Sequence, residues 1–135
     1  MSALLCASGQ TQPFLTCASL LLTRRFHQAV VKDLLDVNRA IGATKAACGL
    51  PLLYQGLGAP YRLILFADVS SITLQSATAQ TGYLLYLAAD DTRGALKPDM
   101  ALILLTWGSH RQRRVTHSSF DAETYALLDG MRAAV

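Results

Sequence analysis

Two acidic residues, Asp68 and Glu123, are the strongest candidates for chemistry in this sequence. Asp68 closes an apolar run that starts at Arg62, and Glu123, the only glutamate of the chain, lies in the first turn of a helix-like segment. Each has a simpler reading, Asp68 as a turn residue and Glu123 as a partner of the helix dipole. If the strand end meets the helix start, however, the two carboxylates converge and offer the oxygen ligands that hard divalent cations need. The pair therefore predicts a site for Mg²⁺ or Mn²⁺ held by Asp68 and Glu123.

Three apolar segments and one C-terminal helix are expected to position these acids. Segments 62–68, 80–88 and 100–107 are rich in Leu, Ile, Tyr and Phe and predict strands, and the first is apolar enough for a central strand. Polar links at 69–79 and 90–99 join them, so the sequence predicts an antiparallel meander. A helix is expected from about Phe120 to the C-terminus, with Ser118 or Ser119 as its N-cap. This helix should cross one face of the sheet.

An amphipathic helix is predicted before the sheet, at about residues 27–47. Its apolar positions recur three and four residues apart, which is typical of a helix face turned to the core. The stripe expected in the core consists of Val30, Leu34, Val37 and Ile41, widened by Val31 and Leu35. Residues 1–22 carry no clear pattern, so no element is predicted there.

The composition predicts a single domain, or part of one, that packs against another protein segment. The chain has 135 residues, of which 16% are charged, against about 25% in a typical soluble domain. No apolar run approaches the roughly 18 residues of a membrane span, so no membrane partner is expected. Cys6, Cys17 and Cys48 lack metal-ligand spacing and predict buried or incidental thiols in a reducing, intracellular compartment, either cytoplasmic or nuclear.

Four short motifs, in order, resemble one family. Residues 66–70 (FADVS) resemble the "DAS" strand end of retroelement ribonuclease H (RNase H) domains, and 76–83 (SATAQTGY) resemble the entry to the second strand. Residues 107–127 hold W-G-S, R-V-T-H-S-S and A-E-T-Y-A-L, similar to that family's third strand and first helix. Residues 31–39 (VKDLLDVNR) resemble the helix between reverse transcriptase and RNase H. The pattern is that of copia-type LTR retroelement Pol polyproteins.

The resemblance implies a metal-dependent RNase H that hydrolyses RNA in RNA–DNA hybrids, with four acids holding two cations. Asp68 and Glu123 match the first two acids, and the other two positions fall beyond Val135. The expected fold is α/β: a truncated RNase H-like domain in 61–135, after an N-terminal linker segment in 1–60. Asp129, six residues after Glu123, should lie on a different helix face and replaces neither acid. Two acids bind one metal weakly at best, so little or no nuclease activity is expected from this chain alone.

Three alternatives remain open from the sequence. The chain is either half of a working nuclease, a non-catalytic remnant that binds nucleic acid or another protein, or an unrelated α/β protein. Arg111, Arg113 and Arg114 suit phosphate contacts to a hybrid and equally suit a solvated loop. In the resembled fold a fourth strand flanks strand 62–68, so that edge should be open here. The N-terminal segment of this chain, the missing C-terminal half of RNase H or a second copy is expected to cover this edge.

Overall fold

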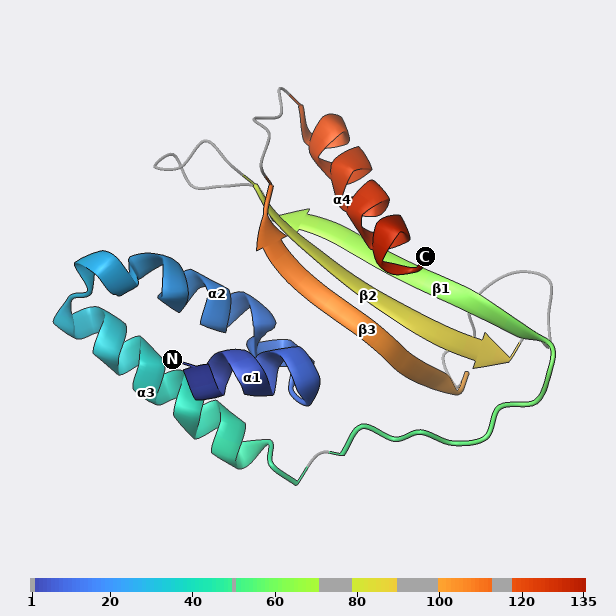
Figure 1. The fold of residues 1–135 in the computed structure, drawn as a ribbon, viewed down its shortest axis with the longest axis horizontal. Helices are drawn as coiled ribbons and strands as arrows, with labels where there is room; N and C mark the ends of the chain where they lie inside the picture. The colour runs from blue at the N-terminus through green and yellow to red at the C-terminus, as the bar shows by residue number, and fades with distance from the viewer. Residues whose placement is uncertain (1, 50, 71–78, 90–99, 113–117) are drawn as a thin grey trace. The chain divides into compact units, whose positions relative to one another are not determined.

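The computed structural model describes residues 2–49, 51–70, 79–89, 100–112 and 118–135. Within them the chain combines helices with a three-stranded sheet (Figure 1). It divides into two compact units: Met1–Leu52 grouped with Gly108–His110, and Leu53–Trp107 with Arg111–Val135. The first holds three α-helices and the second holds the sheet and the C-terminal helix, so each is described by itself.

The sheet is an antiparallel meander, as the sequence predicts. Strands β1 (Tyr61–Ser70), β2 (Gln80–Ala89) and β3 (Leu102–Arg111) lie in the order β1-β2-β3, and successive arrows reverse direction (Figure 1). β1 and β2 pair without interruption from Tyr61 opposite Ala89 to Ser70 opposite Gln80. β1 is therefore an edge of this sheet, and the described residues place no strand on its other side.

Strand β3 is longer than the sequence predicts. A loop is expected from residue 108, but the strand continues through His110 to Arg111. Just beyond it, the Gln112 N–H donates to the carbonyl oxygen of Ala79 at 2.8 Å. This partner lies next to the first residue of β2, so the polar end of β3 satisfies its backbone alongside that strand. Hydrogen bonding to the neighbouring strand thus outweighs the polar composition of residues 108–111.

The C-terminal helix α4 (Ser119–Ala133) begins where the sequence predicts and lies across one face of the sheet (Figure 1). The Ser118 side chain caps it by accepting a hydrogen bond from the Asp121 N–H at 3.1 Å. The buried residues of α4 are Ala122, Ala126 and Gly130, which recur every four residues on one face. Because these side chains are small, the helix axis can approach the strands closely.

The N-terminal unit contains α1 (Ser2–Gln10), α2 (Thr16–Arg25) and α3 (Val31–Ala46), with short 3-10 turns at Pro13–Leu15 and Phe26–Gln28. α1 and most of α2 fall in residues 1–22, where the sequence gives no prediction. Their core is small and consists of Leu4, Leu15, Leu22 and Ala40. Beside it, the Ser19 hydroxyl donates to the Ser8 hydroxyl at 3.0 Å in a buried position. All three cysteines are exposed free thiols, so the prediction that they are buried is wrong.

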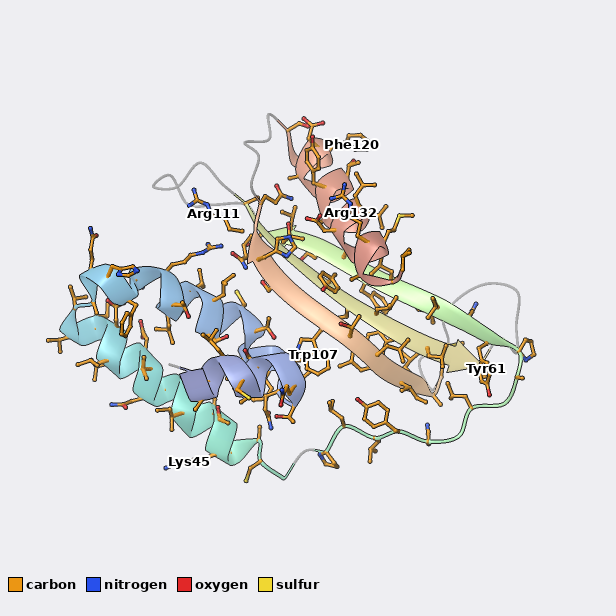
Figure 2. All side chains as sticks on the ribbon, in the orientation of Figure 1. Lys45, Tyr61, Trp107, Arg111, Phe120 and Arg132 are labelled. Carbon is orange, nitrogen blue, oxygen red and sulfur yellow. The ribbon has the colours of Figure 1, made fainter. Side chains whose placement is uncertain are left out.

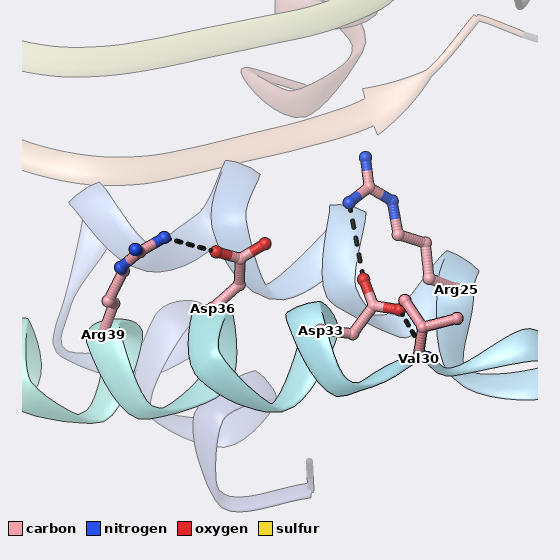
Figure 3. Close-up of polar contacts among 5 residues, drawn as sticks. All are labelled: Arg25, Val30, Asp33, Asp36 and Arg39. Atoms are coloured by element: carbon pink, nitrogen blue, oxygen red, sulfur yellow. Dashed lines mark hydrogen bonds and ion pairs between the residues drawn. The ribbon is translucent and has the colours of Figure 1, made fainter.

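The prediction of which face of α3 enters the core is wrong. Val31 is 75% exposed and Leu34 is 63% exposed, whereas Asp33 and Ala40 are buried. Figure 3 shows the cause: Asp33 Oδ2 accepts from the Val30 N–H at 2.9 Å, and Asp33 Oδ1 pairs with Arg25 of α2 at 3.4 Å. The capping carboxylate thus turns toward α2, and of the apolar stripe only Val37 packs against the core.

Truncating Leu34 distinguishes the observed orientation of α3 from the orientation that the apolar stripe predicts. Because its side chain is exposed, we expect Leu34→Ala to change the free energy of unfolding by less than about 0.5 kcal/mol. Leu22→Ala, at a buried position of α2, is the matched control and should cost about 2–5 kcal/mol. Urea unfolding measures both values. A loss at Leu34 equal to that at Leu22 would restore the orientation that the sequence pattern predicts.

Candidate functional site

The contact between α4 and β1 determines which face of the strand the helix covers. A Cβ atom placed on Gly130 would lie 2.7 Å from Leu65 Cδ1 and 3.0 Å from Cδ2, so the Leu65 side chain points at the helix. Side chains of a strand alternate between its two faces. The odd-numbered residues of β1 therefore lie on the α4 side, and the even-numbered residues lie on the opposite side.

Asp68 lies on the face of the sheet that α4 does not cover. It stands three residues after Leu65, opposite Gly82 in the register of β1 and β2. Phe66 belongs to the same face and makes an edge-to-face contact with Tyr86, with ring centroids 5.8 Å apart. The Asp68 side chain is exposed, and its Oδ1 accepts a hydrogen bond from the Val69 N–H at 2.8 Å.

Glu123 belongs to the helix on the other side of the sheet. It follows the buried Ala122 by one residue, which turns it about 100° around the helix axis, and it is exposed. Asp129 lies elsewhere on the helix, half-buried, with Oδ1 3.4 Å from Arg132 Nη1. Asp68 and Glu123 are thus both exposed, Asp68 on the strand face away from Leu65 and Glu123 near the start of α4.

The magnesium or manganese site that the sequence predicts has two carboxylate donors, Asp68 and Glu123. Two hard cations held against a phosphate need several oxygen ligands that converge on one point. Here Asp68 lies on the edge strand β1, on the face away from Leu65, and its carboxylate accepts from the Val69 N–H. Among the described residues, no group of three or more His, Cys, Asp or Glu side chains has metal-binding geometry. No catalytic step through a metal follows from this arrangement.

Gln112 is a buried residue that the sequence does not single out. It is 4% exposed, and its Nε2 donates to the Ala122 carbonyl oxygen at 2.7 Å, while its backbone N–H binds Ala79. One residue thus ties the end of β3 to the first turn of α4 and to the start of β2. A lone glutamine in a polar stretch carries no spacing or periodicity that would reveal this role.

The predicted basic site is described only in part. Arg111 is the last residue of β3 and is exposed, and Figure 2 shows it at the end of that strand. Arg113 and Arg114 lie outside the described residues, and so does His117. Next to Arg111, the buried Gln112 ties the end of β3 to the first turn of α4.

The fold and site together define a small mixed helix-and-strand protein with an antiparallel meander covered on one face by a helix. Compared with known proteins, the chain matches no family model, no curated protein and no solved structure. In the part of the chain that the structure describes, no helix combines the length and apolar character needed to cross a bilayer.

Proposed function

We propose that this chain is a non-catalytic relative of the RNase H region of copia-type Pol polyproteins and that it acts by binding nucleic acid. One observation carries the non-catalytic part: the Leu65 side chain meets Gly130, so Asp68 lies on the sheet face away from α4. The relationship to RNase H is supported by the order of the four sequence motifs. The helix that carries Glu123 also packs across the strand that carries Asp68, as that family's architecture would require.

The proposed binding element is the basic segment after β3, with Arg111, Arg113 and Arg114 as phosphate contacts. Lysine and arginine side chains beside a polyanion release condensed counterions, which favours binding without any sequence preference. The chain carries a formal net charge of +3 and has no acidic residue between Asp99 and Asp121. No acidic residue near these three arginines in the sequence therefore offsets their positive charge.

The salt dependence of binding tests this element. Each phosphate contact contributes about 0.7–0.9 to the slope of log K against log salt. Replacing Arg111, Arg113 and Arg114 with glutamine should therefore flatten that slope by about 2 to 3, as measured by fluorescence anisotropy with a labelled RNA–DNA hybrid. The matched control removes the same charge at Arg39, Lys45 and Arg132, and should leave most of the slope. An equal change in both triple variants would reduce the proposal to a net-charge effect and contradict it.

The parent activity, hydrolysis of the RNA strand of a hybrid, is the second candidate function. The family motifs at Asp68 and Glu123 favour this activity. The position of Asp68 on the strand face away from α4 argues against it. Incubation of the chain with a labelled hybrid and Mg²⁺ or Mn²⁺ distinguishes the two. We expect no more cleavage than the Asp68→Asn variant gives, with an active RNase H as positive control. Cleavage that disappears in Asp68→Asn would refute the non-catalytic proposal and leave nucleic-acid binding untouched.

A further inference from the structure

Helix α3 carries an apolar face that the fold leaves uncovered. Val31 is 75% exposed, Leu34 is 63% exposed and Ile41 is 37% exposed. Leu34 and Ile41 each follow a buried residue of α3 by one position, which turns them about 100° around the helix axis from Asp33 and Ala40. The uncovered face is therefore a second face of α3, separate from the one that packs against α2 (Figure 1).

The spacing on this face is that of a two-stranded coiled coil. Four residues on it recur three, four and three positions apart: Val31, Leu34, Asn38 and Ile41. These spacings are those of the a and d positions of a heptad repeat, and a β-branched residue at a with leucine at d favours two parallel strands. One polar side chain, that of Asn38, interrupts the stripe at an a position and is exposed. The face thus has the composition of a helix that pairs with one other helix.

We propose that α3 pairs with α3 of a second copy of the chain, parallel and in register, with Asn38 opposite Asn38 near the two-fold axis. Each a or d side chain then meets its own equivalent, so that one polar layer lies between the apolar layers of Leu34 and Ile41. Because the pairing face lies about 100° from the buried face, the remaining helices of the two N-terminal units lie on opposite sides of the helix pair. The N-terminal cap and α2 already hold α3 as a helix, so pairing needs no further folding.

Asn38 selects a second copy over an unrelated apolar partner. An amide that is buried against apolar side chains loses its hydrogen bonds to water, which is costly unless another polar group replaces them. In the in-register pair, Asn38 Oδ1 of one copy accepts from Asn38 Nδ2 of the other. Antiparallel pairing would set Asn38 against Leu34 or Ile41 and leave both amides without a polar partner across the interface.

The residues that flank the stripe agree with this register. In a parallel pair, the residue before an a position meets the residue five positions later in the partner helix. Val30, which is 58% exposed, then packs against Leu35 of the second copy, which is 52% exposed, and the same contact recurs on the other side of the axis. Lys45 occupies the next a position, one residue before the end of α3, where its ammonium group can remain in water.

Replacing Leu34 with a charged residue tests the pairing. In Leu34→Lys two ammonium groups oppose each other across the two-fold axis, and in Leu34→Glu two carboxylates do. We expect each variant to weaken dimerisation roughly 10-fold or more, as measured by sedimentation equilibrium. Ala43→Lys and Ala43→Glu are the matched controls, because Ala43 is also exposed but lies about 180° around the helix from Leu34. Both should dimerise like the native chain, with far-ultraviolet circular dichroism reporting the fold of every variant.

Mixing the variants tests the register itself. When Leu34→Lys pairs with Leu34→Glu in register, the ammonium group meets the carboxylate, so native mass spectrometry should show heterodimers in large excess over either homodimer. A mixture of the two Ala43 variants should show no such preference. A native chain that stays monomeric, Leu34 variants that dimerise as tightly as the native chain, or a Leu34 mixture without preference for heterodimers would each overturn the proposal.

Dimerisation also makes the effect of Leu34→Ala depend on protein concentration. In the monomer this side chain is exposed, so the small effect on the free energy of unfolding applies below the Kd of the dimer. Above that Kd, pairing stabilises the native chain by mass action, and Leu34→Ala should lose part of this stabilisation. The inference does not depend on nucleic-acid binding or on the family relationship.

Discussion

Replacing Gly130 with leucine should detach α4 from the sheet and lower the free energy of unfolding by about 3 kcal/mol. The helix reaches β1 closely because Gly130 lacks a side chain: even a Cβ there would come within 2.7 Å of Leu65 Cδ1. A leucine has no room without displacing the helix. At about 4 °C per kcal/mol, the Tm should fall by roughly 12 °C.

Gly42→Leu is the matched control for this prediction. Gly42 lies in α3, where an added Cβ atom would meet nothing within 4 Å, so leucine there should stabilise the helix by up to about 1 kcal/mol. Adding Leu65→Ala to Gly130→Leu returns space to the contact and should recover part of the loss. If leucine at Gly130 were as harmless as leucine at Gly42, α4 would not pack on β1 through this glycine, and the assignment of faces would fail with it.

Replacing Gln112 with glutamate should make the stability of the fold depend strongly on pH. The native amide donates to the buried carbonyl of Ala122, which a carboxyl group can do only when it carries a proton. Burial and this bond raise the pKa of the introduced carboxyl above its ordinary value of about 4.3. Stability relative to the native chain is therefore kept below that ordinary value and lost as the pH rises through the raised one. At pH 7 we expect a loss of about 3 kcal/mol.

Chemical unfolding of Gln112→Glu and the native chain at matched pH values measures this difference. Gln112→Met keeps the length of the side chain without a titrating group and should cost about 1–2 kcal/mol at every pH. A pH-independent loss in Gln112→Glu would mean that this side chain does not hold the first turn of α4.

The sequence predicts the sheet and α4 well because both depend on local signals. Continuous apolar runs and short links specify the meander, and Ser118 specifies the start of α4 by its hydroxyl. The end of β3 could not be predicted from local signals, since residues 108–111 are polar and are held in the strand alongside β2. The role of Gln112 could not be predicted for a related reason: its partners Ala79 and Ala122 are distant in sequence.

The prediction of the orientation of α3 is wrong for a different reason. A periodic apolar stripe identifies a helix but not the direction of its core, and the Asp33 cap with its Arg25 partner turns this helix by a polar contact. Likewise, shifting the register of a strand by one residue moves every side chain to the opposite face of the sheet. The sequence places Asp68 at the end of β1, but only the Leu65–Gly130 contact reveals that it lies away from α4.

The most direct test of the separation of Asp68 and Glu123 is a Mn²⁺ titration followed by amide NMR signals. A paramagnetic ion shared by the two carboxylates would broaden both signals at the same low Mn²⁺ concentration. We predict that the two signals broaden independently and weakly, and that Asp68→Asn leaves the broadening at Glu123 unchanged. Joint broadening at both residues that Asp68→Asn abolishes would show that the acids share one metal, and would contradict the opposite-face arrangement.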